Sequence, residues 1–125
     1  MQYRIYWKTR DGGRYATKDE LSDIYLTPVG KVKLIEIHGS IAYRNDITDQ
    51  VVVEMWTGET DVLGIKIFHH DKIEVLEAGN LICIGEVCWE NGAWQLEDGC
   101  TLYDLSNYTL QIVGTVHDGD KEAEA

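Results

Sequence analysis

The chain has 125 residues and a mass of 14.2 kDa, 44% of its residues are hydrophobic, and its formal net charge at pH 7 is −11. This length suits one domain or two small subdomains, and the hydrophobic content excludes wholesale disorder. No apolar run approaches the roughly 18 residues of a membrane span, and the first residues have a strand pattern rather than that of a secretory signal, so we expect a cytoplasmic protein.

The charge is distributed unevenly along the chain. Residues 1–44 hold eight basic and five acidic residues, a balance of +3, whereas residues 45–125 hold three basic and seventeen acidic ones, a balance of −14. Direct binding of nucleic acid needs a basic face, so the composition disfavours it. The asymmetry indicates either that the two halves attract each other or that the acidic half faces a basic partner.

Most of the chain alternates apolar and polar residues with a period of two, which is typical of β-strands with one buried face. Residues 3–7 follow this pattern, and residues 31–37 begin in the same way. Turn-forming pairs recur between such runs, among them Gly12-Gly13 and Ala78-Gly79. The sequence therefore predicts a mainly β protein.

One short helix is predicted within this β pattern. Thr17 and Glu20 have the spacing of a capping box, in which each side chain accepts a hydrogen bond from the backbone N–H of the other residue. Pro28 and the β-rich flanks limit this helix to about two turns. At the other end of the chain, residues 118–125 lack apolar anchors and are predicted to form a solvated acidic tail.

A β-hairpin is predicted around Asn91-Gly92, because this pair suits the positive φ angles of a tight two-residue turn. Such a turn places Trp89 opposite Trp94. Side chains alternate, so one face is apolar and the other is acidic. The apolar face holds Val87, Trp89, Trp94 and Leu96, and the acidic face holds Glu86, Cys88, Glu90, Ala93, Gln95 and Glu97.

The two tryptophans allow two interpretations. Because they share a face with Val87 and Leu96, we expect them to pack in the hydrophobic core. The alternative is an exposed platform on which a ligand stacks, but a platform for nucleic acid would need cations nearby, and the opposite face carries glutamates.

The segment Trp56-Thr57-Gly58-Glu59-Thr60-Asp61-Val62-Leu63-Gly64-Ile65-Lys66-Ile67-Phe68-His69-His70-Asp71-Lys72-Ile73 resembles a stretch of the YopX-like family of small phage and prophage proteins. Glu59, Leu63 and His70 depart from the Leu, Asn and Gly of that family. Residues 85–94 are similar to a Gly-x-Val-x-Trp hairpin of the family, and residues 112–117 to its closing Val-Ile-Gly block. The matching positions in the first stretch are Thr57, Gly58, Asp61, Gly64, Ile67, Phe68 and Asp71.

The resemblance implies an SH3-like barrel over residues 56–117, preceded by an N-terminal β-rich subdomain over residues 1–55. It also implies a phage or prophage origin, so that the compartment would be the cytoplasm of the bacterial host. It supplies no catalytic residues. We therefore expect a protein that is not an enzyme and that needs no cofactor.

Few residues have the spacing of a catalytic or metal site. In a strand, His69 and Asp71 would share a face and His70 would point away, which leaves too few ligands for a metal without His38 or His117. The three cysteines, at 83, 88 and 100, match no zinc or redox spacing, and we expect free, mostly buried thiols. We predict no metal site and no catalytic site.

Three functions remain open. The first is a non-catalytic protein that binds a host or phage protein. The second is an acidic mimic of DNA that occupies the basic groove of a nuclease, restriction enzyme or CRISPR effector, although an acidic surface can also serve solubility alone. The third is self-association into a homo-oligomer through the oppositely charged halves. The residues expected to contact a partner are Glu86, Glu90, Glu97, Asp98 and Asp104.

Overall fold

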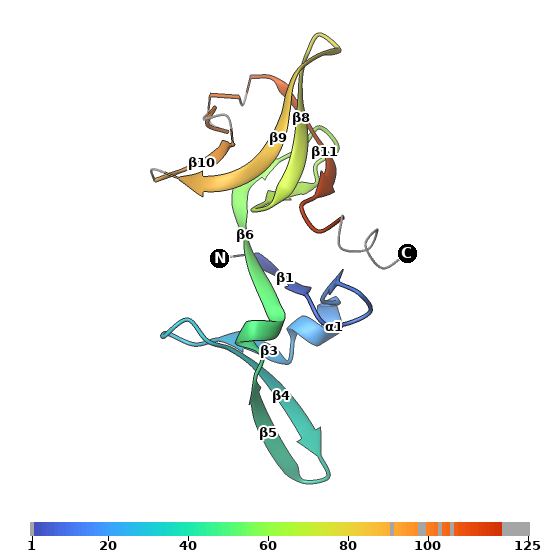
Figure 1. Cartoon of the computed structure of the whole chain (residues 1–125), viewed down its shortest axis with the longest axis vertical. Helices are drawn as coiled ribbons and strands as arrows, with labels where there is room; N and C mark the ends of the chain where they lie inside the picture. The colour runs from blue at the N-terminus through green and yellow to red at the C-terminus, as the bar shows by residue number, and fades with distance from the viewer. Residues whose placement is uncertain (1, 91, 98–99, 103, 106, 119–125) are drawn as a thin grey trace. The chain divides into compact units, whose positions relative to one another are not determined.

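The computed structural model describes residues 2–90, 92–97, 100–102, 104–105 and 107–118. The predicted mainly β fold is confirmed (Figure 1). Contacts divide the chain into two compact units: unit 1 comprises residues 1–3 and 54–125, and unit 2 comprises Arg4–Val53. Within the described residues, no helix is long and apolar enough to cross a membrane.

Unit 2 contains two small β structures and one helix. Its elements are β1 (Tyr3–Trp7), β2 (Arg14–Tyr15), α1 (Lys18–Leu21), β3 (Ile24–Leu26), β4 (Val32–His38), β5 (Ile41–Asp46) and the 3₁₀ turn η1 (Thr48–Gln50). Strand β1 lies between β2 and β6 (Val51–Thr60), while β3, β4 and β5 form an antiparallel sheet in that order. Its buried apolar side chains are those of Ile5, Tyr6, Trp7, Ile24, Val32, Leu34, Ile47 and Val51.

Helix α1 begins with the predicted capping box. Glu20 N–H donates to Thr17 Oγ1 at 3.2 Å, and Thr17 N–H donates to Glu20 Oε1 at 2.9 Å. The helix is shorter than the limit of about two turns, because it ends after one turn at Leu21 and the chain enters β3 at Ile24. Glu20 Oε1 also accepts from Arg14 Nη1 at 2.6 Å, which fixes the helix to strand β2.

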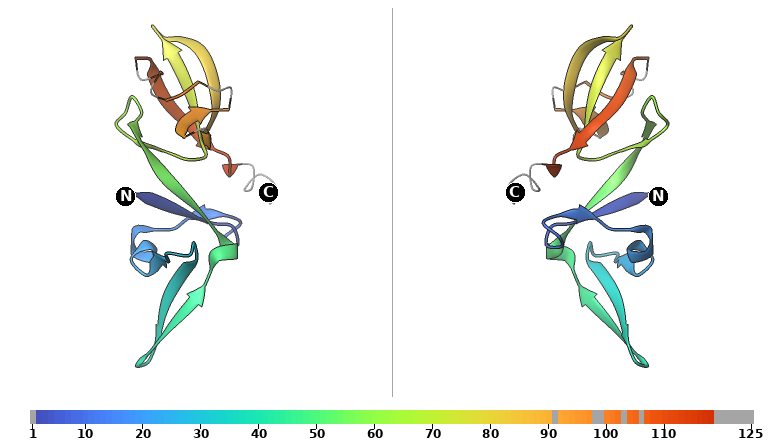
Figure 2. Two further views of the ribbon diagram at one scale, coloured as in Figure 1. Left: turned by 90° about the vertical axis from the view of Figure 1, so that its left-hand side faces the viewer. Right: turned by 90° about the vertical axis from the view of Figure 1, so that its right-hand side faces the viewer.

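Unit 1 is built around one antiparallel sheet that curls on itself (Figure 2). The strands are β7 (Lys66–Phe68), β8 (Asp71–Glu77), β9 (Asn80–Glu90), β10 (Ala93–Leu96) and β11 (Thr109–Thr115). The sheet order is β10-β9-β8-β11, and β7 pairs with the part of β6 that belongs to unit 1.

Strand β9 causes much of this curl because it changes partner along its length. Asn80 to Glu86 pair with β8, whereas Val87 to Glu90 pair with β10. One long strand that serves two pairings in this way makes the sheet barrel-like. Its interior is filled by aliphatic side chains, namely Ile67, Ile73, Val75, Val87, Leu96, Leu102, Leu105 and Leu110.

Two buried carboxylates hold the loops around this core. Asp61 Oδ1 accepts from the N–H groups of Leu63 and Ile65, each at 2.9 Å, and Asp61 Oδ2 is 3.4 Å from the N–H of Ile112 in β11. Asp71 is fully buried, and its Oδ2 accepts from Phe68 N–H at 2.8 Å. Both carboxylates therefore stabilise the fold by accepting hydrogen bonds from backbone N–H groups.

Along the chain, the two units meet between Val53 and Glu54. Residues 2 and 3 nevertheless belong with the C-terminal unit: Gln2 C=O accepts from Trp56 N–H at 2.9 Å. The expected tail at residues 118–125 starts with an anchored residue, because Asp118 Oδ2 accepts from Thr115 N–H at 2.9 Å. Residues 119–125 lie outside the described part of the chain.

The Arg14–Glu20 ion pair predicts an acid-dependent loss of stability in unit 2. The hydrogen bonds from Arg14 lower the pKa of Glu20 from its ordinary 4.5 to about 2. Because the folded-state pKa is the lower one, the pair stabilises the fold above pH 4.5 and stops doing so as the pH falls towards 2. We expect Glu20→Gln to be less stable than wild type at pH 7 and nearly equal to it at pH 2, in urea titrations followed by the indole N–H NMR signal of Trp7. A difference that is independent of pH, or one matched by the exposed control Asp19→Asn, would refute this.

The hydrogen bonds that Asp61 accepts predict that its substitution destabilises unit 1. Asp61→Ala leaves three backbone N–H groups without this acceptor, so we expect the free energy of unfolding to fall by about 2 kcal/mol. Asp104→Ala, which removes an exposed carboxylate, should change it by less than about 0.5 kcal/mol. Equal effects of the two substitutions in chemical denaturation would contradict the role of Asp61.

Candidate functional site

The β9–β10 hairpin has the predicted register. Trp89 pairs with Trp94 and Val87 with Leu96, and Gly92 in the turn has a φ angle of +79°. The expectation that both tryptophans are core residues is wrong for Trp89, whose exposed fraction is 54%. Trp94 is partly buried and packs against the aliphatic core. The apolar face of the hairpin thus runs from the core, at Val87 and Leu96, out to solvent at Trp89.

The two indole rings form one side of an open apolar pocket of about 470 Å³. Their centroids are 5.0 Å apart and their planes meet at 71°, an edge-to-face arrangement. The other side comes from β6 and from the turn between β7 and β8. We call this the aromatic pocket; it is lined by Met55, Trp56, His69, Trp89 and Trp94.

The turn after β7 places His69 in the pocket wall. His70 has a φ angle of +74°, in the left-handed region, so the chain turns there instead of continuing as a strand. The expectation that His69 and His70 point in opposite directions is therefore wrong: their rings stack with centroids 3.8 Å apart. His69 also lies edge-on to Trp94, with ring centroids 5.4 Å apart.

Two histidine–carboxylate pairs lie next to the turn that carries His69. His70 Nδ1 donates to Glu86 Oε1 at 3.0 Å, and His117 Nε2 donates to Glu54 Oε2 at 2.9 Å. Glu54 is fully buried, and the rings of His70 and His117 are 6.0 Å apart. These hydrogen bonds fix the orientation of both imidazole rings and place a glutamate carboxylate beside each of them.

His69 is uncharged at neutral pH. Burial lowers its pKa below the ordinary value of 6.5, and the neighbouring His70 adds to this effect, while the carboxylates of Glu54 and Glu86 oppose it. The pocket wall is therefore aromatic and neutral at pH 7, in a unit that is strongly acidic.

The acidic face of the hairpin also forms, but it is not uniform. Burial raises the pKa of the Cys88 thiol above 9.0, and the carboxylates of Glu90, Glu86 and Glu97 raise it further, so all three lie around this residue. Glu90 and Glu97 are exposed, whereas Glu86 is engaged by His70. Gln95 on this face is buried, and its Nε2 donates to the carbonyl of Glu90 at 3.0 Å.

The other two residues predicted to contact a partner are Asp98 and Asp104. Asp104 is exposed beyond β10, and Asp98 lies outside the described residues. The expectation of mostly buried thiols is wrong, because Cys83 and Cys88 are only partly buried and Cys100 is exposed. In the described part of the chain, no group of three or more His, Cys, Asp or Glu side chains has the geometry to hold a metal ion.

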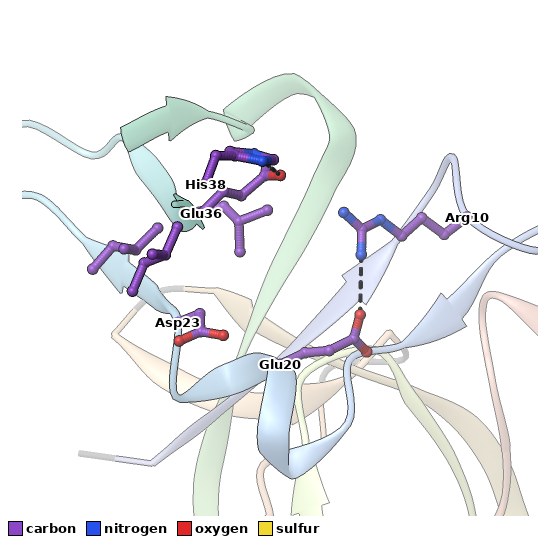
Figure 3. Close-up of a pocket in the computed structure, with 8 residues that line it drawn as sticks. Arg10, Glu20, Asp23, Glu36 and His38 are labelled. Carbon is purple, nitrogen blue, oxygen red and sulfur yellow. Dashed lines mark hydrogen bonds and ion pairs between the residues drawn. The ribbon is translucent and has the colours of Figure 1, made fainter. Parts of the chain in front are cut away.

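Unit 2 has a polar hollow of about 350 Å³ between the loop after β1, helix α1 and strand β4 (Figure 3). Arg10 Nη1 is 3.1 Å from Glu20 Oε2, and its guanidinium stacks 3.8 Å above the Trp7 ring. Glu36 accepts from Asn45 Nδ2 at 2.6 Å and lies 3.7 Å from His38 Nε2. The ionisable groups of Arg10, Glu20, Glu36 and His38 are thus already paired within unit 2. The aromatic pocket is therefore the stronger candidate for binding a ligand.

Sequence reasoning identified Trp89 and Trp94 but missed their partners in the pocket. Met55 and Trp56 reach it from β6, and His69 reaches it from the turn before β8. A signal for that turn was present: the family that the chain resembles has glycine at the position of His70, and glycine favours a positive φ angle.

The local electrostatics predict how His69 titrates. We expect its imidazole, followed by NMR, to have a midpoint below 6.5, because burial and the His70 charge both disfavour the imidazolium. His70→Gln should raise this midpoint and Glu86→Gln should lower it. A midpoint at or above 6.5, or one indifferent to both substitutions, would show that the cluster is not arranged as described.

No protein-family model, no curated protein and no solved structure matches the chain. The resemblance to the YopX-like family therefore stays a prediction. Function has to be argued from the site, because a mainly β, barrel-like fold is compatible with many activities.

Proposed function

We propose that the chain is a non-catalytic interaction protein that binds a partner protein, from a host or a phage, through the aromatic pocket of unit 1. The observation that carries this proposal is the half-exposed ring of Trp89 beside Trp94, at the edge of a pocket of about 470 Å³. Tryptophan is enriched among the residues that dominate binding energy at protein interfaces. An exposed cluster of such rings is typical of a binding surface.

The charge of unit 1 favours a basic partner. Residues 1–3 and 54–125 include three basic and fifteen acidic residues, a net charge of −12, whereas Arg4–Val53 include eight basic and seven acidic ones. A field of this sign steers basic proteins towards unit 1 and repels nucleic acid. Aromatic anchors combined with a surrounding acidic field match the anatomy of a specific interface.

The cysteine of the hairpin lacks the properties of a nucleophile. The Cys88 thiol, on the face opposite the pocket, is held protonated at neutral pH by burial and by three carboxylates, whereas a nucleophile needs a thiolate. His70 and His117 each direct one ring nitrogen to a glutamate, which orients both rings.

A second candidate is the acidic DNA mimic. It is favoured by the convergence of Glu86, Glu90 and Glu97 on one face of the hairpin, around Cys88. Glu86 contributes less than expected because it is paired with His70. On this account the exposed carboxylates of Glu90 and Glu97, and not the aromatic pocket, would contact a basic groove.

A comparison of variants tests the proposal and separates the two candidates. In capture experiments from host lysate, we expect Trp89→Ala to reduce recovery of a bound protein at least tenfold, the scale of a lost interface anchor. Leu63→Ala, at a residue that is 72% exposed and outside the pocket, should leave recovery unchanged. Recovery that survives Trp89→Ala but is lost with Glu90→Lys or Glu97→Lys, and not with the control Glu77→Lys, would favour the mimic instead.

A further inference from the structure

We propose that the aromatic pocket of unit 1 receives a positively charged side chain, arginine in particular, from its partner protein. This inference rests on the proposed function and names the chemical group that the pocket recognises. It follows from three features of the described residues: the arrangement of the rings, the way the chain places its own cations, and the charge around the pocket.

Three indole rings line the pocket. Trp89 and Trp94 pack edge to face, with their planes at 71°, and Trp56 and His69 line the same hollow from other elements. A cation within about 6 Å of an indole centroid is attracted to the negative face of the ring. Arginine suits such a lining because its planar guanidinium stacks on aromatic faces and is weakly hydrated.

The chain already places its own cations on aromatic rings. The ammonium of Lys66 lies 5.1 Å from the centroid of Trp56, which is itself a wall of the pocket. In unit 2, the guanidinium carbons of Arg10 and Arg4 lie 3.8 Å and 4.4 Å from the rings of Trp7 and Tyr15. A cation on an aromatic face is thus a recurring contact among the described residues.

The charge around the pocket favours a cation over a neutral apolar group. His69 adds no positive charge to the lining at pH 7, and the ammonium of Lys66 lies on Trp56, 5.1 Å from its ring centroid. The carboxylates of Glu86 and Glu54 accept hydrogen bonds from His70 and His117, and unit 1 as a whole is strongly acidic. A neutral apolar ligand would gain nothing from this field, whereas an arginine would.

Matched peptides test the inference on the full chain. The probes are short Gly-Ser peptides with one central arginine, lysine, citrulline or leucine, titrated at pH 7.5 and followed by NMR of the tryptophan side chains. We expect the arginine peptide to bind about tenfold more tightly than the citrulline peptide, which has nearly the same shape without the charge. Equal binding of citrulline or leucine would overturn the inference.

Variants at Trp89 show whether the ring is responsible. Trp89→Phe keeps an aromatic face and should keep the preference for arginine over citrulline. Trp89→Leu keeps apolar bulk but removes the ring, and should lose that preference. Because Trp89 is 54% exposed, both variants should fold, and Leu63→Ala provides a control at another exposed apolar position. A Trp89→Leu protein that discriminates as well as wild type would contradict the inference.

Acidification gives an independent check. Protonated His69 adds a positive charge to the wall, so arginine binding should weaken several-fold as His69 titrates, below pH 6.5. The charged groups near His69 are His70, Glu54 and Glu86, with His117 beside His70. His69→Gln should abolish this part of the pH dependence. If His69→Gln and wild type weaken equally, the guanidinium does not lie against His69.

The peptide and capture experiments together distinguish a wrong cation inference from a wrong proposed function. If Trp89→Ala abolishes partner capture but the peptides show no preference for arginine, the pocket is a protein-binding surface and the cation inference is wrong. If the arginine preference depends on Trp89 but partner capture does not, the proposed function is wrong and the pocket recognises cations in another setting.

Discussion

The register of the β9–β10 hairpin is the constraint on which the candidate site depends. The tight turn at Gly92 pairs Trp89 with Trp94, and the same register sends Val87 and Leu96 into the core. A slip of one residue would turn every one of these side chains to the other face. The core contacts of Val87 and Leu96 therefore fix the position of two rings that are not themselves fully buried.

The two rings lie at the outer end of the apolar face of the hairpin. Eight aliphatic side chains occupy the interior of unit 1, and Trp94 packs on them as the last layer. Trp89 is paired with Trp94 across the hairpin, and its side chain stays 54% exposed. The buried Glu54–His117 pair and the His70–Glu86 pair then fix the neighbouring turn, so that His69 contacts Trp94. Packing and charge pairing together produce an aromatic pocket in an acidic unit.

Local chemistry was predictable from the sequence wherever a short motif decided it. Thr17 and Glu20 form the predicted capping box, and Trp89 pairs with Trp94 as the Asn91-Gly92 turn requires. The burial of Trp89 was not predictable in this way. It depends on which residues reach the far side of the hairpin, and those come from β6 and from the turn before β8.

The histidine cluster escaped prediction for two physical reasons. A period of two holds only while the backbone stays extended, and the positive φ angle of His70 breaks it, which brings the rings of His69 and His70 together. Glu54 and His117 are 63 residues apart in the sequence, so their hydrogen bond is a product of the tertiary fold. Alternation along one strand carries no information about such a pairing.

The central claim is that the aromatic pocket of unit 1, and not another surface, contacts the charged group of a partner. The most direct measurement follows the indole N–H signals of all four tryptophans during titration of the full chain with the arginine peptide. The pocket account predicts that the signals of Trp89 and Trp94 shift, while the signal of Trp7, buried in unit 2, stays constant. Equal shifts at Trp7, or shifts that spare Trp89 and Trp94, would contradict it.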